Sequence, residues 1–137
     1  MLSILIPTYN YNVVPLVNEL HEQCLECGIM FEILVYDDGS KSQINSINNT
    51  INNIQNCTFK ELPDNIGRSS IRNLLGKNAQ YESLIFLDAD VIPFNKTFIK
   101  DYLNLINNPV SVGGVIPTKK TPNKPHKLRW IYTKRRE

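Results

Sequence analysis

Three apolar runs that each end in polar residues constrain the fold of this chain more than any other feature. They are SILIPTYN at 3–10, FEILVYDDGS at 31–40 and SLIFLDAD at 83–90. A continuous apolar run is typical of a strand that is buried on both faces of a sheet. Because parallel strands cannot be joined by a tight turn, a helix is expected in each connection.

The segments between these runs have the apolar spacing of helices. Apolar residues recur every three or four positions over 13–27, with Asn12 as the expected N-cap and Gly28 as the expected end. A second stripe at 44–54 crosses the asparagine-rich INSINNTINNIQN, and its period indicates an amphipathic helix rather than a disordered linker. Further patterns predict strands at 57–62 and 110–117, a turn followed by a helix at 65–79, and a helix at 95–108.

This order of elements predicts one α/β domain from the 137 residues. The expected architecture is a Rossmann-like, mostly parallel sheet with helices on both faces. In open α/β sheets ligands bind beyond the carboxyl ends of the strands. The polar residues at 8–10, 37–39 and 88–90 all follow such ends, so we expect them to meet in one crevice.

The cysteines and the length of the apolar runs predict a cytoplasmic protein. Cys24 and Cys27 lack the second pair that a zinc site needs, which indicates buried thiols in a reducing compartment. No apolar run approaches the roughly 20 residues that span a bilayer. The start of the chain lacks the basic region of a signal peptide.

Charge is divided between an acidic body and a basic arm. Residues 119–137 hold 8 of the 15 Lys and Arg and 1 of the 13 Asp and Glu, a net charge of +7, which leaves 7 basic and 12 acidic groups, a net charge of −5, in residues 1–118. The positive charge of the arm would allow it to contact the acidic crevice, a diphosphate bound there or the anionic inner face of a membrane. The arm has no recognisable nucleic-acid-binding motif. A loose, solvated arm is the alternative. The apolar LRWIY at 128–132 predicts that Trp130 packs on the rest of the protein or on a second copy, which would favour a homo-oligomer.

The DAD and DDGS motifs each allow a structural and a functional interpretation. An aspartate at a strand end can cap a helix, and Asp-Gly is ordinary turn chemistry. Two neighbouring carboxylates repel each other unless a cation or hydrogen-bond donors offset their charge. A D-x-D pair suits a hard divalent cation that shares its ligand shell with a diphosphate. An acid within DDGS can accept a hydrogen bond from a nucleotide base or from ribose.

Two arginines are expected at the start of the helix that follows NIG at 65–67. At this position Arg68 and Arg72 find few free carbonyl groups to bind. We interpret them as partners of the strand-end aspartates or of phosphate, with a purely structural salt bridge as the alternative.

Other nucleotide-binding and catalytic classes lack their motifs in this chain. There is no G-x-x-x-x-G-K-[ST], and PTYN at 7–10 stands where a dinucleotide-binding fold has G-x-G-x-x-G. A phospho-receiver domain would have an acid pair after the first strand, where this chain has none. The two histidines form no Ser-His-Asp arrangement, and His21 is expected to face solvent.

In this order and at these spacings, the motifs resemble the N-terminal, nucleotide-sugar-binding half of family 2 glycosyltransferases, which have the GT-A fold. The resembling segments are SILIPTYN, ILVYDDGS, NIGRSSIRN and LIFLDAD, and they extend over about residues 2–118. LRWIYTKRRE is similar to a segment of bacterial members. The resemblance implies a nucleotide-sugar-binding half-domain at 1–118, followed at 119–137 by a basic arm that begins a missing acceptor-binding half.

The resemblance also implies a role for each motif residue. Asp38 would bind the imide edge of the base, which the end of the first strand flanks. Asp88 would approach the ribose, and Asp90 would coordinate Mg²⁺ or Mn²⁺ on the diphosphate. Arg72 corresponds to an arginine near the base and its acid partner. The implied nucleotide-binding set is Pro7, Thr8, Tyr9, Asp38, Asn65, Gly67, Arg68, Arg72, Asp88 and Ala89, with Asp90 as the metal ligand.

The activity that the resemblance implies is transfer of a sugar from a nucleotide diphosphate-sugar donor to an acceptor hydroxyl with inversion. The acceptor would be a sugar or a lipid-linked glycan, in bacterial polysaccharide or glycoconjugate synthesis. The family's catalytic base is an Asp or Glu beyond the end of this chain, and neither Asp101 nor Glu137 fits that role. We therefore expect a truncated or naturally short donor-binding half. A nucleotide-binding or interaction module without turnover is the alternative.

Overall fold

The predicted alternation of strands and helices is present in the computed structural model, which describes residues 1–105. The strand predicted at 110–117 and the basic arm at 119–137 lie outside the described residues. The elements are β1 (Leu2–Thr8), α1 (Val14–Glu26), β2 (Phe31–Asp37), α2 (Asn45–Asn48), the 3₁₀-helix η1 (Asn49–Asn53), β3 (Cys57–Glu61), α3 (Arg68–Asn78), β4 (Leu84–Phe86) and α4 (Phe98–Leu103).

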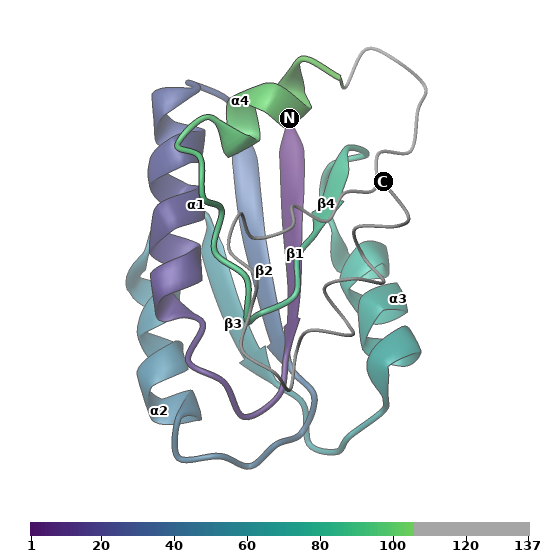
Figure 1. The fold of residues 1–137 in the computed structure, drawn as a ribbon. Helices are drawn as coiled ribbons and strands as arrows, with labels where there is room; N and C mark the ends of the chain where they lie inside the picture. Colours follow the sequence, from purple (N-terminus) through teal and green to yellow (C-terminus); the bar gives the residue numbers. More distant parts are fainter. Residues whose placement is uncertain (106–137) are drawn as a thin grey trace, which may run out of the picture. The chain divides into compact units, whose positions relative to one another are not determined.

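The four strands are parallel and lie in the order β3-β2-β1-β4, so the first strand of the chain is in the middle of the sheet (Figure 1). β1 pairs with β2 from Leu2 opposite Phe31 to Thr8 opposite Asp37, and the two strands therefore end at the same level. This arrangement confirms the predicted α/β class, with a sheet that is parallel throughout the described part of the chain.

Both faces of the sheet are covered, as the apolar runs predict. Side chains of β1 alternate between the faces: Ile4 and Ile6 pack in the cluster that includes α1 and α4, and Leu5 packs with α3. All three are fully buried, and each such side chain contributes about 1.5–3 kcal/mol through burial. Figure 1 shows α1, α2 and α4 away from α3, with the sheet between the two layers.

The asparagine-rich segment differs from the single amphipathic helix that its period predicts. It forms the four-residue α2 and then the 3₁₀-helix η1. Ile51 is buried in the core, but Ile47 is 49% exposed, so only part of the apolar stripe is used. The side chains of Asn45 and Asn48 are buried and hydrogen-bond to other loops. Short polar side chains that bond elsewhere compete with a regular helix, which explains the difference.

The later elements are shorter than the sequence predicts. The strand expected at 83–90 is the three-residue β4, because a turn in which the Val91 N–H donates to the Asp88 carbonyl at 3.3 Å follows it. The helix expected at 95–108 is the six-residue α4, whereas α3 begins at Arg68 after a turn, as predicted. None of the described helices is long and apolar enough to cross a membrane.

α1 has the predicted length but differs in two local details. Val13 rather than Asn12 occupies the N-cap position, although the Asn12 side chain still accepts a hydrogen bond from the Val14 N–H at 3.2 Å. The prediction that His21 faces solvent is wrong. His21 is half-buried, and its ring packs edge-on against Phe31 with 5.5 Å between the ring centroids.

The three cysteines are free thiols, as predicted. Cys24 and Cys57 are buried and Cys27 is half-buried. Burial raises the pKa of Cys24 and of Cys57 to about 12. At neutral pH these two thiols are therefore protonated and poor nucleophiles, which fits a structural role.

Candidate functional site

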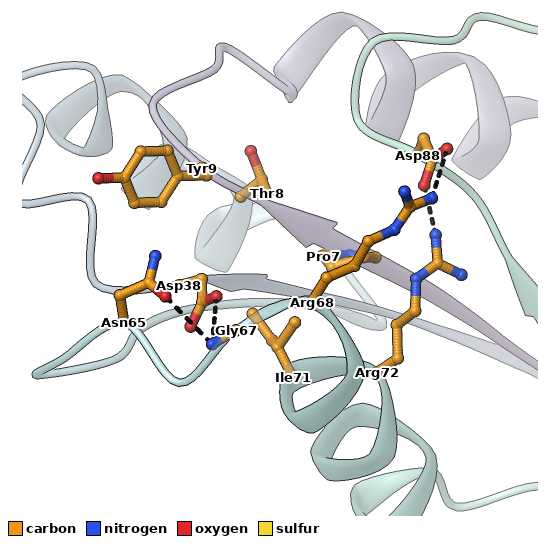
Figure 2. Close-up of a pocket in the computed structure, with 10 residues that line it drawn as sticks. All are labelled: Pro7, Thr8, Tyr9, Asp38, Asn65, Gly67, Arg68, Ile71, Arg72 and Asp88. Atoms are coloured by element: carbon orange, nitrogen blue, oxygen red, sulfur yellow. Dashed lines mark hydrogen bonds and ion pairs between the residues drawn. The ribbon is translucent and has the colours of Figure 1, made fainter.

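A cavity of about 310 Å³ opens at the carboxyl edge of the sheet (Figure 2). Every residue that lines it belongs to the predicted nucleotide-binding set, with the single exception of Ile71. Of that set, only Ala89 does not line the cavity, and the predicted metal ligand Asp90 also lies outside the lining. The lining consists of Pro7, Thr8, Tyr9, Asp38, Asn65, Gly67, Arg68, Ile71, Arg72 and Asp88.

The end of β1 contributes an unpaired hydroxyl group to the cavity. Thr8 is the last residue of β1 and is only 4% exposed. Its carbonyl accepts a hydrogen bond from the Asp38 N–H at 2.9 Å, but its Oγ1 has no hydrogen-bond partner among the described residues. Buried polar atoms are rarely left unpaired, so this hydroxyl is an exception among the described residues. The next residue, Tyr9, is 58% exposed at the mouth.

Asp38 follows β2 and is nearly fully buried. Its Oδ1 accepts a hydrogen bond from the Ile66 N–H at 2.7 Å, and its Oδ2 accepts one from the Gly67 N–H at 3.0 Å. Each oxygen of an ionised carboxylate has capacity for a second donor. Asp38 therefore anchors the turn before α3 and still presents an acceptor to the cavity.

Gly39 allows the two segments around Asp38 to approach each other closely. Its φ is +66°, in the region that favours glycine, and a Cβ atom at this position would lie 2.6 Å from the Asn65 backbone nitrogen. Real side chains do not tolerate this distance. The glycine of DDGS is thus needed to bring the Ile66 and Gly67 amides onto Asp38.

Asp37 has a different environment from its neighbour and does not line the cavity. It is fully buried, and its carboxylate accepts hydrogen bonds from the Ser40 N–H at 2.7 Å and the Ser40 hydroxyl at 2.8 Å. The Asn10 N–H also donates to it, at 3.4 Å. The adjacent acids of the DDGS motif are thus directed to different partners, and only Asp38 is available to a ligand in the cavity.

Two arginines on α3 hold Asp88 (Figure 2). The Arg72 guanidinium hydrogen-bonds to Asp88 Oδ1 and lies 5.6 Å from the centroid of the Phe86 ring. The Arg68 guanidinium lies 3.6 Å from Asp88 Oδ2, and its side chain is 78% exposed. Two cationic groups share one carboxylate, which leaves an excess of positive charge that suits phosphate. The interpretation of Arg68 and Arg72 as partners of a strand-end aspartate is confirmed, and that aspartate is Asp88.

Residues 1–105 contain no cluster of three or more His, Cys, Asp or Glu that could hold a metal ion by itself. Asp90 is exposed on the loop after β4. A divalent cation at Asp90 would need further oxygen ligands, which waters and phosphates commonly supply.

Sequence reasoning missed Ile71 as a residue of the cavity and placed it only in the core. It is fully buried and contacts the cluster between α3 and the sheet. The signal was available, because residues three positions apart on a helix share a face and Ile71 follows Arg68 by three. No comparable local pattern in the sequence indicates that Asp37 and Asn48 support the loops around the cavity through hydrogen bonds.

The sequence is similar to those of known proteins. The sequence matches the family described as Glycosyl transferase family 2 over residues 3–137. It is 32% identical over 120 residues to a chondroitin synthase of Escherichia coli, and the match covers 86% of this chain and 17% of that protein.

Solved structures share the fold. S. aureus TarS 1–349 in complex with UDP-GlcNAc has a TM-score of 0.64 and 27% sequence identity, over 86% of this chain and 38% of that one. The mannosyltransferase PcManGT from Pyrobaculum calidifontis, in complex with GDP-Man and Mn²⁺, has a TM-score of 0.63 and 20% identity, over 79% of this chain and 32% of that one. The fold is GT-A-like, and the chain spans less than half the length of each of these proteins.

Proposed function

Since the chain belongs to glycosyl transferase family 2, we propose that its cavity binds the nucleotide of a nucleotide diphosphate-sugar donor, with UDP as that nucleotide. TarS, which is 27% identical, has been solved with UDP-GlcNAc and with UDP, and this supports uridine for this chain. The proposed reaction is transfer of the donor's sugar to an acceptor hydroxyl.

The observation that carries this proposal is which polar atoms of the residues around the cavity have hydrogen-bond partners. Thr8 Oγ1 and Arg72 Nε are buried without a hydrogen-bond partner in the described part of the chain, and both residues line the cavity. Asp38 lies near Thr8 and apart from Arg72 (Figure 2), and it offers only acceptor capacity. The edge of uracil has an N–H donor between two carbonyl acceptors. The Asp38 carboxylate is the acceptor that this N–H requires, and Arg72 lies on the side of the cavity that holds Asp88.

On this proposal the base occupies the side of the cavity formed by the ends of β1 and β2, and the ribose lies toward Asp88, which follows β4. Asp38 accepts the uracil N–H, and Asp88, held by Arg72, approaches the ribose hydroxyls. Arg68 is the more exposed arginine and turns toward the diphosphate. The remaining proposed nucleotide contacts are Pro7, Thr8, Tyr9, Asn65, Gly67 and Ala89.

The set of acidic residues fits a Mg²⁺ or Mn²⁺ ion that is bound together with the donor. Mg²⁺ is commonly held by one or two carboxylates with waters and substrate phosphates, rather than by a complete protein site. The exposed Asp90 and the lack of a larger ligand cluster within residues 1–105 match this mode. We therefore propose Asp90 as the protein ligand. When bound, the ion neutralises charge that develops on the departing diphosphate.

The proposed chemistry is one displacement at the anomeric carbon with inversion. The acceptor oxygen forms a bond to this carbon while the bond to the UDP oxygen breaks, and the acceptor's proton passes to a base. We assign the base to no residue within 1–105: Asp101 lies in α4, where it accepts a hydrogen bond from the Thr97 hydroxyl at 3.0 Å. The proposed acceptor is a sugar or a lipid-linked glycan of a bacterial polysaccharide or glycoconjugate.

Titration calorimetry of the full chain with UDP, with and without Mn²⁺, tests the proposal. We expect binding that depends on Mn²⁺ in the unmutated chain and loses that dependence in Asp90→Ala. Equal affinity with and without Mn²⁺ in the unmutated chain would contradict the metal assignment, and no UDP binding would contradict the nucleotide site. Release of UDP from a UDP-sugar then separates a transferase from a binding module without turnover.

A further inference from the structure

A chain of buried polar side chains connects the asparagine-rich segment to the loop that carries Tyr9. Asn48 is fully buried; its Oδ1 accepts a hydrogen bond from the Val13 N–H at 3.1 Å, and its Nδ2 donates to the Tyr11 carbonyl at 2.9 Å. The same Nδ2 lies 3.4 Å from Asn45 Oδ1.

The chain continues from α2 to the end of β2. Asn45 is 2% exposed, and its Nδ2 donates to the Ser40 hydroxyl oxygen at 3.4 Å. That hydroxyl donates in turn to Asp37, whose carboxylate also accepts the Asn10 N–H. The loop from Tyr9 to Asn12 is therefore held on one side by Asp37 and on the other by Asn48.

This loop has a conformation that needs external support. Asn10 has a φ of +52°, a left-handed conformation that is uncommon for a residue with a side chain. Its side-chain oxygen accepts a hydrogen bond from the Ser42 hydroxyl at 2.6 Å, so a further polar contact comes from the turn after β2. Strained backbone of this kind persists only where surrounding contacts determine it.

We propose that Asn48 and Asp37 are positioning residues for the donor nucleotide: they fix the Tyr9–Asn12 loop in the conformation that places Tyr9 at the cavity. This inference rests on the proposed function. It gives the asparagine-rich segment a role in nucleotide affinity, although no residue of that segment lines the cavity.

The same segment contains a matched control. Asn52 pairs with one backbone residue, as its Oδ1 accepts the Phe59 N–H at 2.8 Å and its Nδ2 donates to the Phe59 carbonyl at 3.3 Å. Asn52 makes the same type of hydrogen bonds as Asn48, although it is exposed and Asn48 is fully buried, and its bonds support β3 and not the loop at the cavity. Asn52→Ala therefore reports the loss of such a contact without an effect on Tyr9.

The first measurement needs no nucleotide. In Asn48→Ala, amide hydrogen exchange at Asn10 to Val13 should become faster relative to the rest of the chain, whereas in Asn52→Ala the increase should be confined to the region of Phe59. Unchanged exchange at 10–13 in a folded Asn48→Ala would overturn the positioning role. Asn45→Ala removes only the link between Ser40 and Asn48 and provides a second, milder variant with the same expected pattern.

The second measurement is UDP affinity by calorimetry with Mn²⁺ present. We expect a loss of about tenfold for Asn48→Ala, a smaller loss for Asn45→Ala, and less than about twofold for Asn52→Ala. Equal losses in the Asn48 and Asn52 variants would show a general effect of stability and overturn the inference. Failure of the unmutated chain to bind UDP would instead overturn the proposed function, and the exchange experiment would then decide the inference alone.

Discussion

Asp38 and Asp88 both line the cavity, yet the fold holds them in different ways. Asp38 is 6% exposed and accepts two backbone N–H groups from a turn that Gly39 allows to approach. The Asp88 side chain is 50% exposed, and the side chains that hold it are Arg68 and Arg72. Backbone donors fix the first carboxylate, while long side chains hold the second.

This difference separates a preorganised side of the cavity from an adaptable one. On the Asp38 side, backbone hydrogen bonds already fix the acceptor, so a rigid ligand would lose little conformational entropy on binding. On the Asp88 side, exposed ion pairs contribute little to stability and exchange partners easily. A flexible ligand with hydroxyl and phosphate groups is suited to the second environment.

The largest effect is expected from breaking the close approach on the preorganised side. Gly39→Ala places a Cβ atom 2.6 Å from the Asn65 backbone nitrogen and should lower the free energy of unfolding by at least about 3 kcal/mol. Gly28→Ala is the control, because Gly28 has a similar φ of +61° but open space around its Cβ position, and it should cost about 1–2 kcal/mol. Urea denaturation measures both, and equal costs would show that the close approach is unimportant.

The next comparison is between a buried and an exposed aspartate. Asp37→Asn replaces an acceptor of three hydrogen bonds and should lower the free energy of unfolding by about 2–3 kcal/mol. Asp88→Asn should change it by less than about 1 kcal/mol, because its ion pairs are solvated. A thermal or urea unfolding series compares the two variants. A larger loss for Asp88→Asn would reverse the assignment of the two sides.

Asp38→Asn tests whether the preorganised carboxylate also reads the base. The amide can accept on one side only, so it loses either a backbone contact or the contact to the uracil N–H. UDP affinity should fall by about 1–3 kcal/mol in calorimetry. If affinity is unchanged while the protein is folded, Asp38 has only the structural role of holding the turn at Ile66 and Gly67.

The smallest effect is expected for Arg68→Ala on the adaptable side. Stability should change by less than about 1 kcal/mol, because the Arg68 side chain is 78% exposed. UDP affinity should fall by about fivefold at low salt and less at high salt, since the lost contact is screened. Uridine, which has no phosphate, should bind the variant and the unmutated chain equally. A loss for uridine as well would place Arg68 with the base.

The sequence was most informative about strands whose own residues indicate how they are buried. β1 and β2 are mostly apolar because both of their faces are buried, and the parallel register then brings Thr8 and Asp38 to one edge. Predicting these strands and the strand before Asp88 was sufficient to predict that Asp38 and Asp88 line one cavity. The sequence also placed Arg68 and Arg72 at the start of a helix, where α3 has them.

The sequence was least informative where side chains bond across long distances in the chain. Asn48 ends α2 early and holds Tyr11 and Val13, and no local pattern encodes partners 35 or more residues away. The length of β4 depends on a turn closed at Asp88. Whether Asp90 binds a metal stays a prediction.

The central position of β1 also has a consequence for the order of folding. Ser3 pairs with Glu32 on one side and with Leu84 on the other, so the second pairing closes a far longer loop than the first. Loop-closure entropy makes distant parallel pairings slow, and we expect β1 and β2 to associate before β4 docks. During synthesis the same order applies, because β4 emerges last of the four strands. The chain therefore assembles Asp37, Asp38 and the Tyr9 loop first and adds Asp88 as the final step, so that an intermediate without β4 already contains much of the preorganised side of the cavity.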